Sequence, residues 1–452
     1  MSGDIRISRG ANIKLKGGAE KILTEASFPK SCAIKPKNFF NVIPKMIVRE
    51  GDKVALGSPI FYDKKDPRII FVSPASGVVK EIIRGERRKI LEITIELSSS
   101  NQNKFSHKIE NFEFLTPEKI KDLLLKSGSW PFIRQRPFNV LADPNSLPKS
   151  IHISATSSEP LGVDYDFIIK NNKEDFQRGI DVLNKFLPGK VNLFIDRSFG
   201  GFFLKVKNVN IFSVSGPHPS GNVSVQIQKT DPINFGEKVW VIQPEDIANI
   251  GKLFSTGIFN CQRTIAVSGS PVANPQYFKT IIGANLPSFI SKLNIDKSFQ
   301  NRYINGCVFS GIEVEEIGHI DFYNNLLSVI PEGNNYRFFG WLPFVDNRIP
   351  SLSKTSLSWL FGRKGYKVDT NLNGEERALV VTGEMEKVFP MNIYPMQLIK
   401  ACMAGDIEKM EGLGIYEVVP EDFGLIDYSN TSKIEAQDII REGIELIIKE
   451  TA

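Results

Sequence analysis

Two stretches near the N-terminus share a pattern of short apolar, mostly β-branched runs interrupted by turn residues. The first is VREGDKVALGSPI (Val48–Ile60), with Gly51-Asp52 at its turn, and the second is VSPASGVVKEI (Val72–Ile82), with Ser76-Gly77. Glycine and aspartate tolerate the backbone angles that hairpin turns need. The pattern therefore predicts two hairpin-like units, followed by a half-buried strand in which apolar and polar residues alternate over Ile90–Leu97.

This arrangement resembles the flattened β-sandwich of biotinyl and lipoyl carrier domains. A carrier presents its modified lysine in the hairpin between the two units, which reads FYDKKDPR (Phe61–Arg68) in this chain. Lys64 and Lys65 lie in that hairpin, without the Met-Lys-Met or Asp-Lys-Ala setting of the carriers. We expect a structural sandwich over residues 1–100, with neither lysine modified.

From about residue 108 to 260 the pattern changes to strands that alternate with helices. The first helix has Thr116 as N-cap, Pro117 at its first position and Gly128 as its stop. Further segments follow in the order strand, helix, strand, strand and strand-into-helix: Ser150–Ala155, Phe176–Gly189, Lys190–Asp196, Val209–Ser215 and Val239–Gly257. This alternation predicts an open, largely parallel α/β sheet of Rossmann-like type.

The remainder of the chain predicts two further units. Strand, turn, strand and short helix over Arg263–Leu293 indicate a small β-grasp domain, of SLBB-like type, at 261–330. Residues 331–452 predict short strands over Tyr336–Phe344 and then C-terminal helices. Ser432 with Glu435 indicates a capping box for the last helix, whose apolar face consists of Ile434, Ile440, Ile444 and Ile447.

Composition and charge exclude few classes of protein. The 452 residues are 41% hydrophobic and 24% charged, as in soluble globular proteins, and the net charge of +5 is too small to indicate nucleic-acid binding. Cations gather locally in RGERRK (Arg84–Lys89) and, nearby in sequence, at Lys64, Lys65 and Arg68. This basic group is either a solvated loop or a surface attracted to an anionic membrane or an acidic partner.

Cysteine and histidine positions predict no metal site. The four cysteines (Cys32, Cys261, Cys307 and Cys402) are scattered without a C-x-x-C pair, and the four histidines are equally dispersed. No apolar run reaches the roughly 18 residues that span a bilayer, and the N-terminus has no apolar signal region. A reducing cytoplasm fits best, with any membrane contact made through a partner.

The order of these units, together with several local sequence blocks, resembles the NqrA family, the A subunits of bacterial sodium-pumping NADH:quinone oxidoreductases. The resemblance covers essentially the whole chain. Its most specific blocks are SWPFIRQRPF (Ser129–Phe138), SGPHPSGNVSVQI (Ser215–Ile227), SGSPVANP (Ser268–Pro275) and the segments Asn371–Asp406 and Pro420–Ile440. Related flavin and electron-transfer subunits carry iron–sulfur cysteines near the C-terminus, where this chain has Ile426, Ser429 and Asn430.

The resemblance implies a peripheral subunit on the cytoplasmic side of the bacterial inner membrane. The complex would be a translocase that couples NADH oxidation and ubiquinone or menaquinone reduction to Na⁺ export. NADH, the flavins and the [2Fe-2S] centre would belong to other subunits, and this chain would dock on the membrane-embedded B subunit without a redox cofactor of its own. We do not expect the isolated chain to be catalytic.

A quinone needs an apolar slot for its ring and hydrogen-bond donors for its two carbonyl oxygens. The block at 129–138 contains both kinds of residue, and Phe39 and Phe40 form a second candidate. The alternative is that these aromatics are core residues and the arginines face solvent or an interface. The candidate quinone-binding residues are Trp130, Phe132, Arg134, Gln135, Arg136, Phe138, Phe39 and Phe40.

Several further interpretations stay open. The chain lacks a G-x-G-x-x-G or P-loop, and Gly200-Gly201 is typical of a turn. His218, between two prolines, is either a proton relay or, more simply, a loop brace, and Glu313, Glu315 and Glu316 indicate an exposed strand edge. The alternatives to quinone binding are a pure assembly scaffold and a flavin-dependent NADH dehydrogenase subunit.

Overall fold

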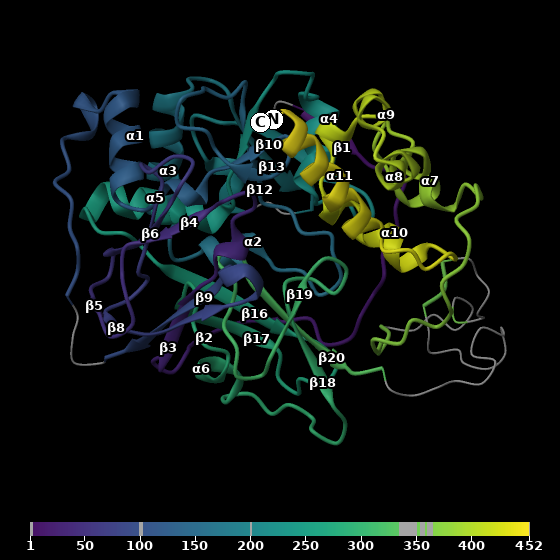
Figure 1. Ribbon diagram of the computed structural model, residues 1–452, viewed down its shortest axis with the longest axis horizontal. Helices are drawn as coiled ribbons and strands as arrows, with labels where there is room; N and C mark the ends of the chain where they lie inside the picture. The colour runs from purple at the N-terminus through teal and green to yellow at the C-terminus, as the bar shows by residue number, and fades with distance from the viewer. Residues whose placement is uncertain are drawn as a thin grey trace.

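The computed structural model describes residues 3–98, 103–198, 201–333, 350–352, 358 and 365–451. Within those ranges the strands form sheets of seven, six, four and three strands (Figure 1). The predicted strands at Tyr336–Phe344 lie outside the described residues. No helix of the described part has the length and apolar character that crossing a membrane requires.

Residues 31–97 form a sandwich of the four-stranded and the three-stranded sheet. The four-stranded sheet contains β3 (Ser31–Ile34), β9 (Ile90–Leu97), β8 (Gly77–Arg84) and β5 (Lys53–Val54), and the three-stranded sheet contains β4 (Pro44–Met46), β6 (Pro59–Asp63) and β7 (Ile70–Val72). The predicted hairpin that carries Lys64 and Lys65 is present between β6 and β7.

The two turns singled out in the sequence are present, but they do not close hairpins. The turn at Gly51-Asp52 leads from β4 to β5, and the one at Ser76-Gly77 leads from β7 to β8. In each case the chain passes from one sheet to the other, because β4 pairs with β6 whereas β5 pairs with β8. Local turn chemistry fixed the bend and left the pairing partner undetermined.

The seven-stranded sheet is open and largely parallel, as predicted. Its order is β1-β14-β13-β12-β15-β10-β11, in which the first five strands are mutually parallel and β10 is antiparallel to both of its neighbours, β15 and β11. The strands are β1 (Gly3–Arg6), β10 (Arg134–Arg136), β11 (Val140–Leu141), β12 (Ile151–Ser154), β13 (Val191–Asp196), β14 (Asn210–Ser215) and β15 (Val239–Val241).

Alternate side chains of this sheet enter different cores. Ile153 and Leu193 pack with the helices α3 and α5, whereas Phe194 and Val214 pack with the C-terminal helices. The helices of this region are α1 (Pro117–Lys126), α2 (Tyr165–Ile169), α3 (Lys173–Phe186), α4 (Val223–Thr230) and α5 (Pro244–Thr256). Thr116 caps α1 by accepting a hydrogen bond from the Lys119 amide, as predicted.

The six-stranded sheet has the order β19-β18-β20-β16-β17-β2. Its elements are β2 (Glu20–Glu25), β16 (Gln262–Ser268), β17 (Gln276–Ile281), α6 (Pro287–Ile290), β18 (Asn301–Asn305), β19 (Ile312–Val314) and β20 (Leu326–Pro331). The strands and short helix predicted within 263–293 are present. Glu313, Glu315 and Glu316 are exposed on or beside the edge strand β19, which confirms that prediction.

The first 25 residues lie outside the sandwich, whereas the sequence placed residues 1–100 in one domain. β1 pairs with β14 at the edge of the seven-stranded sheet, and β2 pairs with β17 at the edge of the six-stranded sheet. Such pairings join segments far apart in the chain, and a local pattern of apolar and polar residues does not encode them.

The C-terminal helices are α7 (Glu384–Val388), α8 (Pro395–Ala404), α9 (Ile407–Gly412), α10 (Gly424–Ser429) and α11 (Ala436–Thr451). The four isoleucines predicted for the apolar face of the last helix are buried. The predicted capping box is wrong, because Ser432 donates to the Ala378 carbonyl and α11 begins four residues later. The Asp427 carboxylate instead accepts hydrogen bonds from the amides of Ala436 and Gln437, at 2.6 and 3.3 Å.

Candidate functional site

A cavity of about 340 Å³ lies at the carboxyl edge of the parallel sheet. The chain leaves β12 toward β13 and β14 on one side, and it returns to β15 on the other side of β12. Open parallel sheets bind ligands at such a switch point, outside the carboxyl ends of the strands. Ser154 ends β12, Val241 ends β15, and both line the cavity.

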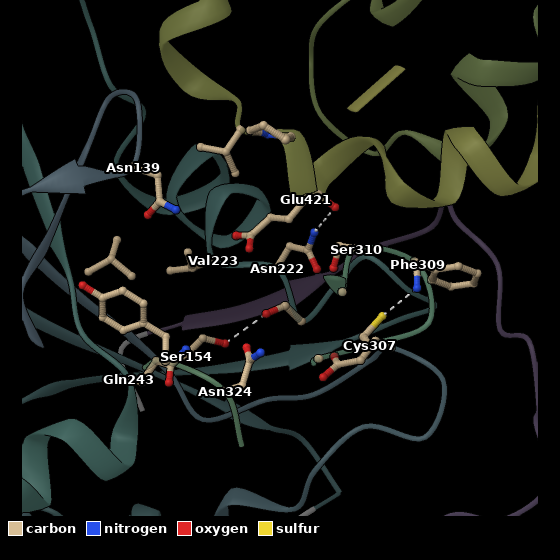
Figure 2. Close-up of a pocket in the computed structure, with 18 of the residues that line it drawn as sticks. Asn139, Ser154, Asn222, Val223, Gln243, Cys307, Phe309, Ser310, Asn324 and Glu421 are labelled. Carbon is tan, nitrogen blue, oxygen red and sulfur yellow. Dashed lines mark hydrogen bonds between the residues drawn. The ribbon is translucent and has the colours of Figure 1, made fainter. Parts of the chain in front are cut away.

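Distant parts of the chain complete the cavity wall. Phe40 comes from the turn after the short 3-10 helix at Pro36–Asn38, Cys307 and Phe309 come from the loop between β18 and β19, and Glu421 precedes α10. Figure 2 shows side chains from several of these segments around one space, with Asn139, Ser154 and Gln243 on the sheet side and Glu421 on the C-terminal side. The cavity therefore lies where the sheets and the C-terminal helices meet.

Three of the eight residues predicted to bind quinone line this cavity: Phe40, Arg134 and Phe138. The Arg134 guanidinium carbon lies 4.7 Å from the centre of the Tyr323 ring, and Tyr323 lines the cavity too. Arg134 Nε is buried and has no hydrogen-bond partner within the described part of the chain. Phe138 is half-buried, with its ring centre 5.5 Å from that of Tyr416.

Three of the predicted residues, Trp130, Phe132 and Gln135, are buried and do not line the cavity. Trp130 Nε1 donates a 2.8 Å hydrogen bond to the Ala142 carbonyl, and the Phe132 ring stacks on Phe259 with 5.7 Å between centres. Gln135 Oε1 accepts a hydrogen bond from the Asp143 amide at 3.3 Å. These side chains hold the strand that carries Arg134.

Arg136 and Phe39 also have partners elsewhere. Arg136 is buried and its Nη2 lies 3.0 Å from Glu421 Oε1, so it ties β10 to the C-terminal region. Burial lowers the pKa of the Arg136 guanidinium, although the Glu421 carboxylate opposes this shift. Phe39 packs on Phe71 and Phe322, with ring centres 4.4 and 4.9 Å away.

The cavity presents polar groups that the sequence did not reveal. The side-chain carbonyl oxygens of Asn305 and Asn325, both buried, and of Gln243 and Asn139, both half-buried, have no hydrogen-bond partner within the described residues. Buried polar atoms are normally paired, so these atoms provide hydrogen-bonding capacity for an occupant. Gln243 lies two residues beyond the end of the buried strand β15, a position from which a site at the carboxyl edge could have been predicted.

Glu159, in the loop after β12, is the carboxylate on the sheet side of the cavity. Burial raises the pKa of this carboxyl, while hydrogen bonds from the backbone amides of Glu159 and Ser158 oppose the rise. The group therefore keeps its proton to a higher pH than an exposed glutamate does.

His218 lines the cavity and is buried. Its Nδ1 lies 3.1 Å from Ser158 Oγ, which in turn accepts a 2.7 Å hydrogen bond from the Gly221 amide. Burial lowers the pKa of His218 to about 4, so the ring is neutral near pH 7. These contacts brace the loops that follow β12 and β14.

The described part of the chain contains no group of three or more histidine, cysteine or acidic side chains placed to hold a metal ion. Cys307 lines the cavity, and its Sγ accepts a 3.2 Å hydrogen bond from the Phe309 amide. Burial raises the pKa of this thiol to about 12, so it is protonated at neutral pH.

A parallel sheet with a cavity at its switch point, joined to a β-sandwich and to a six-stranded sheet, defines a multidomain α/β protein. Family models match three parts of the chain. They describe the NqrA N-terminal barrel-sandwich hybrid domain (residues 5–98), the NqrA second alpha/beta domain (115–259) and an NQRA C-terminal domain of SLBB type (264–316).

Full-length relatives agree with these models. The A subunit of the Na(+)-translocating NADH-quinone reductase of Pasteurella multocida is 33% identical over 99% of this chain and 100% of its own length. The proteins of the same name from Neisseria meningitidis serogroup B and Yersinia pestis are 31% and 33% identical, each over 99% of this chain and 100% of its own length. The chain belongs to the NqrA family, the A subunits of Na⁺-translocating NADH-quinone reductases. An NAD⁺-reducing [NiFe]-hydrogenase structure aligns at a TM-score of only 0.36, with 12% identity, over 71% of this chain and 63% of its own.

Proposed function

We propose that this chain is the peripheral, cytoplasmic-side subunit of a complex that oxidises NADH, reduces ubiquinone or menaquinone and exports Na⁺. We propose further that it docks on the membrane-embedded B subunit and holds a quinone headgroup in the cavity at the switch point. The observation that carries the quinone proposal is the meeting of Phe40, Arg134 and Phe138 in one cavity. These three residues are among those that the sequence predicted on chemical grounds.

The lining suits a quinone headgroup. Phe40, Phe138 and Phe309 supply aromatic faces, and Arg134 supplies a positive charge. A guanidinium beside a quinone oxygen stabilises the negative charge that reduction places there. Burial raises the pKa of Glu159, so this carboxyl binds a proton more readily than an exposed glutamate does, and it is the acid of the cavity lining from which such an oxygen could take a proton.

Two finer assignments belong to the same proposal. The seven-stranded sheet is a Rossmann-like domain that carries no redox cofactor, since the loop after β12 reads ATSSEPLG (155–162) in place of a glycine-rich phosphate loop. The six-stranded sheet is a β-grasp domain. Flavins, the iron–sulfur centre and NADH are then bound by other subunits, and this chain contributes binding and positioning.

The test is calorimetric titration of the full chain with a short-tailed ubiquinone. Arg134→Gln removes the charge at the cavity, and we expect it to weaken binding about tenfold, as loss of a charge-assisted hydrogen bond does. Arg6→Gln, at an exposed arginine on β1, serves as the matched control and should bind like the parent chain. Absence of binding by the parent chain would favour the assembly scaffold instead.

A further inference from the structure

We infer that the tip of the β8–β9 hairpin, residues 84–89, is a contact site for the anionic phospholipid surface of a membrane. This inference goes beyond quinone binding and does not depend on it. It starts from the backbone of the turn and continues through the charges and apolar side chains that the turn presents.

The turn has a conformation that its residues disfavour. The Gly85 amide donates to the Lys89 carbonyl, and the Lys89 amide donates to the Glu86 carbonyl, which closes a tight turn around Arg87 and Arg88. Both arginines have positive φ, of 51° and 61°. Two successive left-handed residues define a type I′ turn, which Asn-Gly forms with little strain and other side chains form at a cost. Backbone strain of this kind points to a role for the side chains that it presents.

The same turn carries an uncompensated positive charge. Arg84, Arg87, Arg88 and Lys89 are exposed, and none forms an ion pair within the described residues. Glu86 is the carboxylate within the turn itself, which leaves an excess of cations. The second basic hairpin differs, because Arg68 there is held by both carboxylate oxygens of Asp66. Of the two basic segments, the β8–β9 tip is therefore the one whose arginines are free to bind an anionic surface.

Apolar side chains flank the cations, which favours a lipid surface over an acidic protein. Ile83, on β8, and Leu91, on β9, are each 37% exposed beside the turn. Cations next to exposed aliphatic side chains suit the boundary between headgroups and acyl chains. The guanidinium group also matches the geometry of a phosphate.

The test is co-sedimentation of the full chain with lipid vesicles at low ionic strength. We expect binding to vesicles in which about one third of the lipid is phosphatidylglycerol, weak binding to pure phosphatidylcholine, and loss of binding as salt screens the charges. The variant Arg87→Asn/Arg88→Gly removes two charges and introduces the residues that a type I′ turn prefers. We expect this variant to bind the anionic vesicles at least about tenfold more weakly than the parent chain. Its melting temperature should equal or exceed that of the parent chain.

Lys170→Gln/Lys190→Gln removes the same charge from exposed positions elsewhere and should bind like the parent chain. Failure of the parent chain to bind the anionic vesicles, or equal binding by the Asn-Gly variant, would overturn the inference. Equal losses in both double variants would also overturn it, because they would show a general effect of net charge. Since the Asn-Gly variant keeps its turn, misfolding cannot imitate the expected result.

Discussion

At the scale of single residues, three charged side chains are completely buried where β16 meets the start of α5. Arg263 Nη2 lies 2.8 Å from Asp246 Oδ1, and Arg263 Nη1 lies 3.6 Å from Glu245 Oε2. Burial raises the pKa of both carboxyls, and the Arg263 charge opposes that rise. Glu245 also accepts a hydrogen bond from the Thr264 amide, so the group fastens α5 to the six-stranded sheet.

Removing the Arg263 guanidinium should strongly destabilise the protein. Arg263→Met leaves two buried carboxylates without their partner, and we expect a loss of about 3–5 kcal/mol in the free energy of unfolding. Arg178→Met, which breaks a partly exposed pair with Asp175, should cost less than about 1 kcal/mol. Urea denaturation of both variants measures the difference. Equal losses of unfolding free energy in the two variants would show that the buried group of Arg263, Glu245 and Asp246 contributes no more than an exposed ion pair.

His152 should make stability depend on pH. Its ring is buried on β12, and burial lowers the pKa to about 4, compared with about 6.5 in an unfolded chain. A lowered pKa contributes stability above about pH 6.5 that is lost as the pH falls toward 4. We expect His152→Gln to reduce this loss, as measured by urea denaturation between about pH 7 and pH 4.

The comparison must be made between variant and parent, because Asp427 acts in the opposite direction. Burial raises the pKa of its carboxyl to about 6, so its contribution is present at low pH and is lost as the pH rises toward 6. Identical pH profiles for the parent chain and His152→Gln would contradict the assignment of His152.

The residue types alone indicated part of the candidate site. The block at 129–138 and the pair Phe39-Phe40 were singled out for their aromatic rings and donors, and one or two residues of each line the cavity. Which residue of a pair faces the cavity is set by tertiary packing, as Phe39 and Phe40 show. The amides of Asn305 and Asn325 come from other parts of the chain, and a single sequence does not reveal that they meet there.

At the scale of elements, α3 and α5 cross with their backbones in contact. A Cβ on Gly251 would lie 1.8 Å from the Asp175 carbonyl oxygen, and one on Gly179 would lie 2.1 Å from that of Ile247. Only glycine permits this approach, and the two helices together cover one face of the parallel sheet (Figure 1).

Substitution of either glycine should separate the helices. We expect Gly251→Ala to lower the melting temperature by several degrees, although alanine is the better helix former by about 1 kcal/mol. Gly412→Ala, in α9 where nothing lies within 4 Å of an added Cβ, should stabilise the protein slightly. Thermal unfolding followed by circular dichroism distinguishes the two. A stabilising Gly251→Ala would contradict the close crossing.

Most elements followed from local sequence, whereas several connections did not. The strands and helices that the sequence predicted between 116 and 257 are present, whereas β10, β11, α2 and α4 were not predicted. The hairpins at Gly51-Asp52 and Ser76-Gly77 failed because a turn does not determine which strand pairs with the one that follows it. The capping box at Ser432 failed because Asp427, from another helix, caps α11 through a tertiary contact.

At the scale of the whole molecule, the N-terminal segment joins parts that the sequence presents as separate. Ser213 donates a 2.7 Å hydrogen bond to Asp4, although the two are 209 positions apart. Ile5 is buried against the C-terminal helices, while β2 closes the edge of the six-stranded sheet. A domain order taken along the chain misses this connection, because pairing over such distances depends on the assembled fold.

The role of this segment can be tested by truncating one side chain. We expect Ile5→Ala to cost about 2–4 kcal/mol in the free energy of unfolding, as at a core position. Ile22→Ala, at a half-exposed side chain on β2, should cost less than about 1 kcal/mol. Urea denaturation measures both values. An Ile5→Ala variant as stable as the parent chain would show that β1 is dispensable for the fold.

The central claim is that a quinone occupies the cavity where the sheets and the C-terminal helices meet. The most direct measurement is to react the assembled complex with a photoreactive quinone and to map the labelled peptides. We predict label on the segments that line the cavity, above all residues 134–141 and 305–311, and less label when unmodified quinone competes. Label confined to other subunits would contradict the claim and leave this chain as an assembly scaffold.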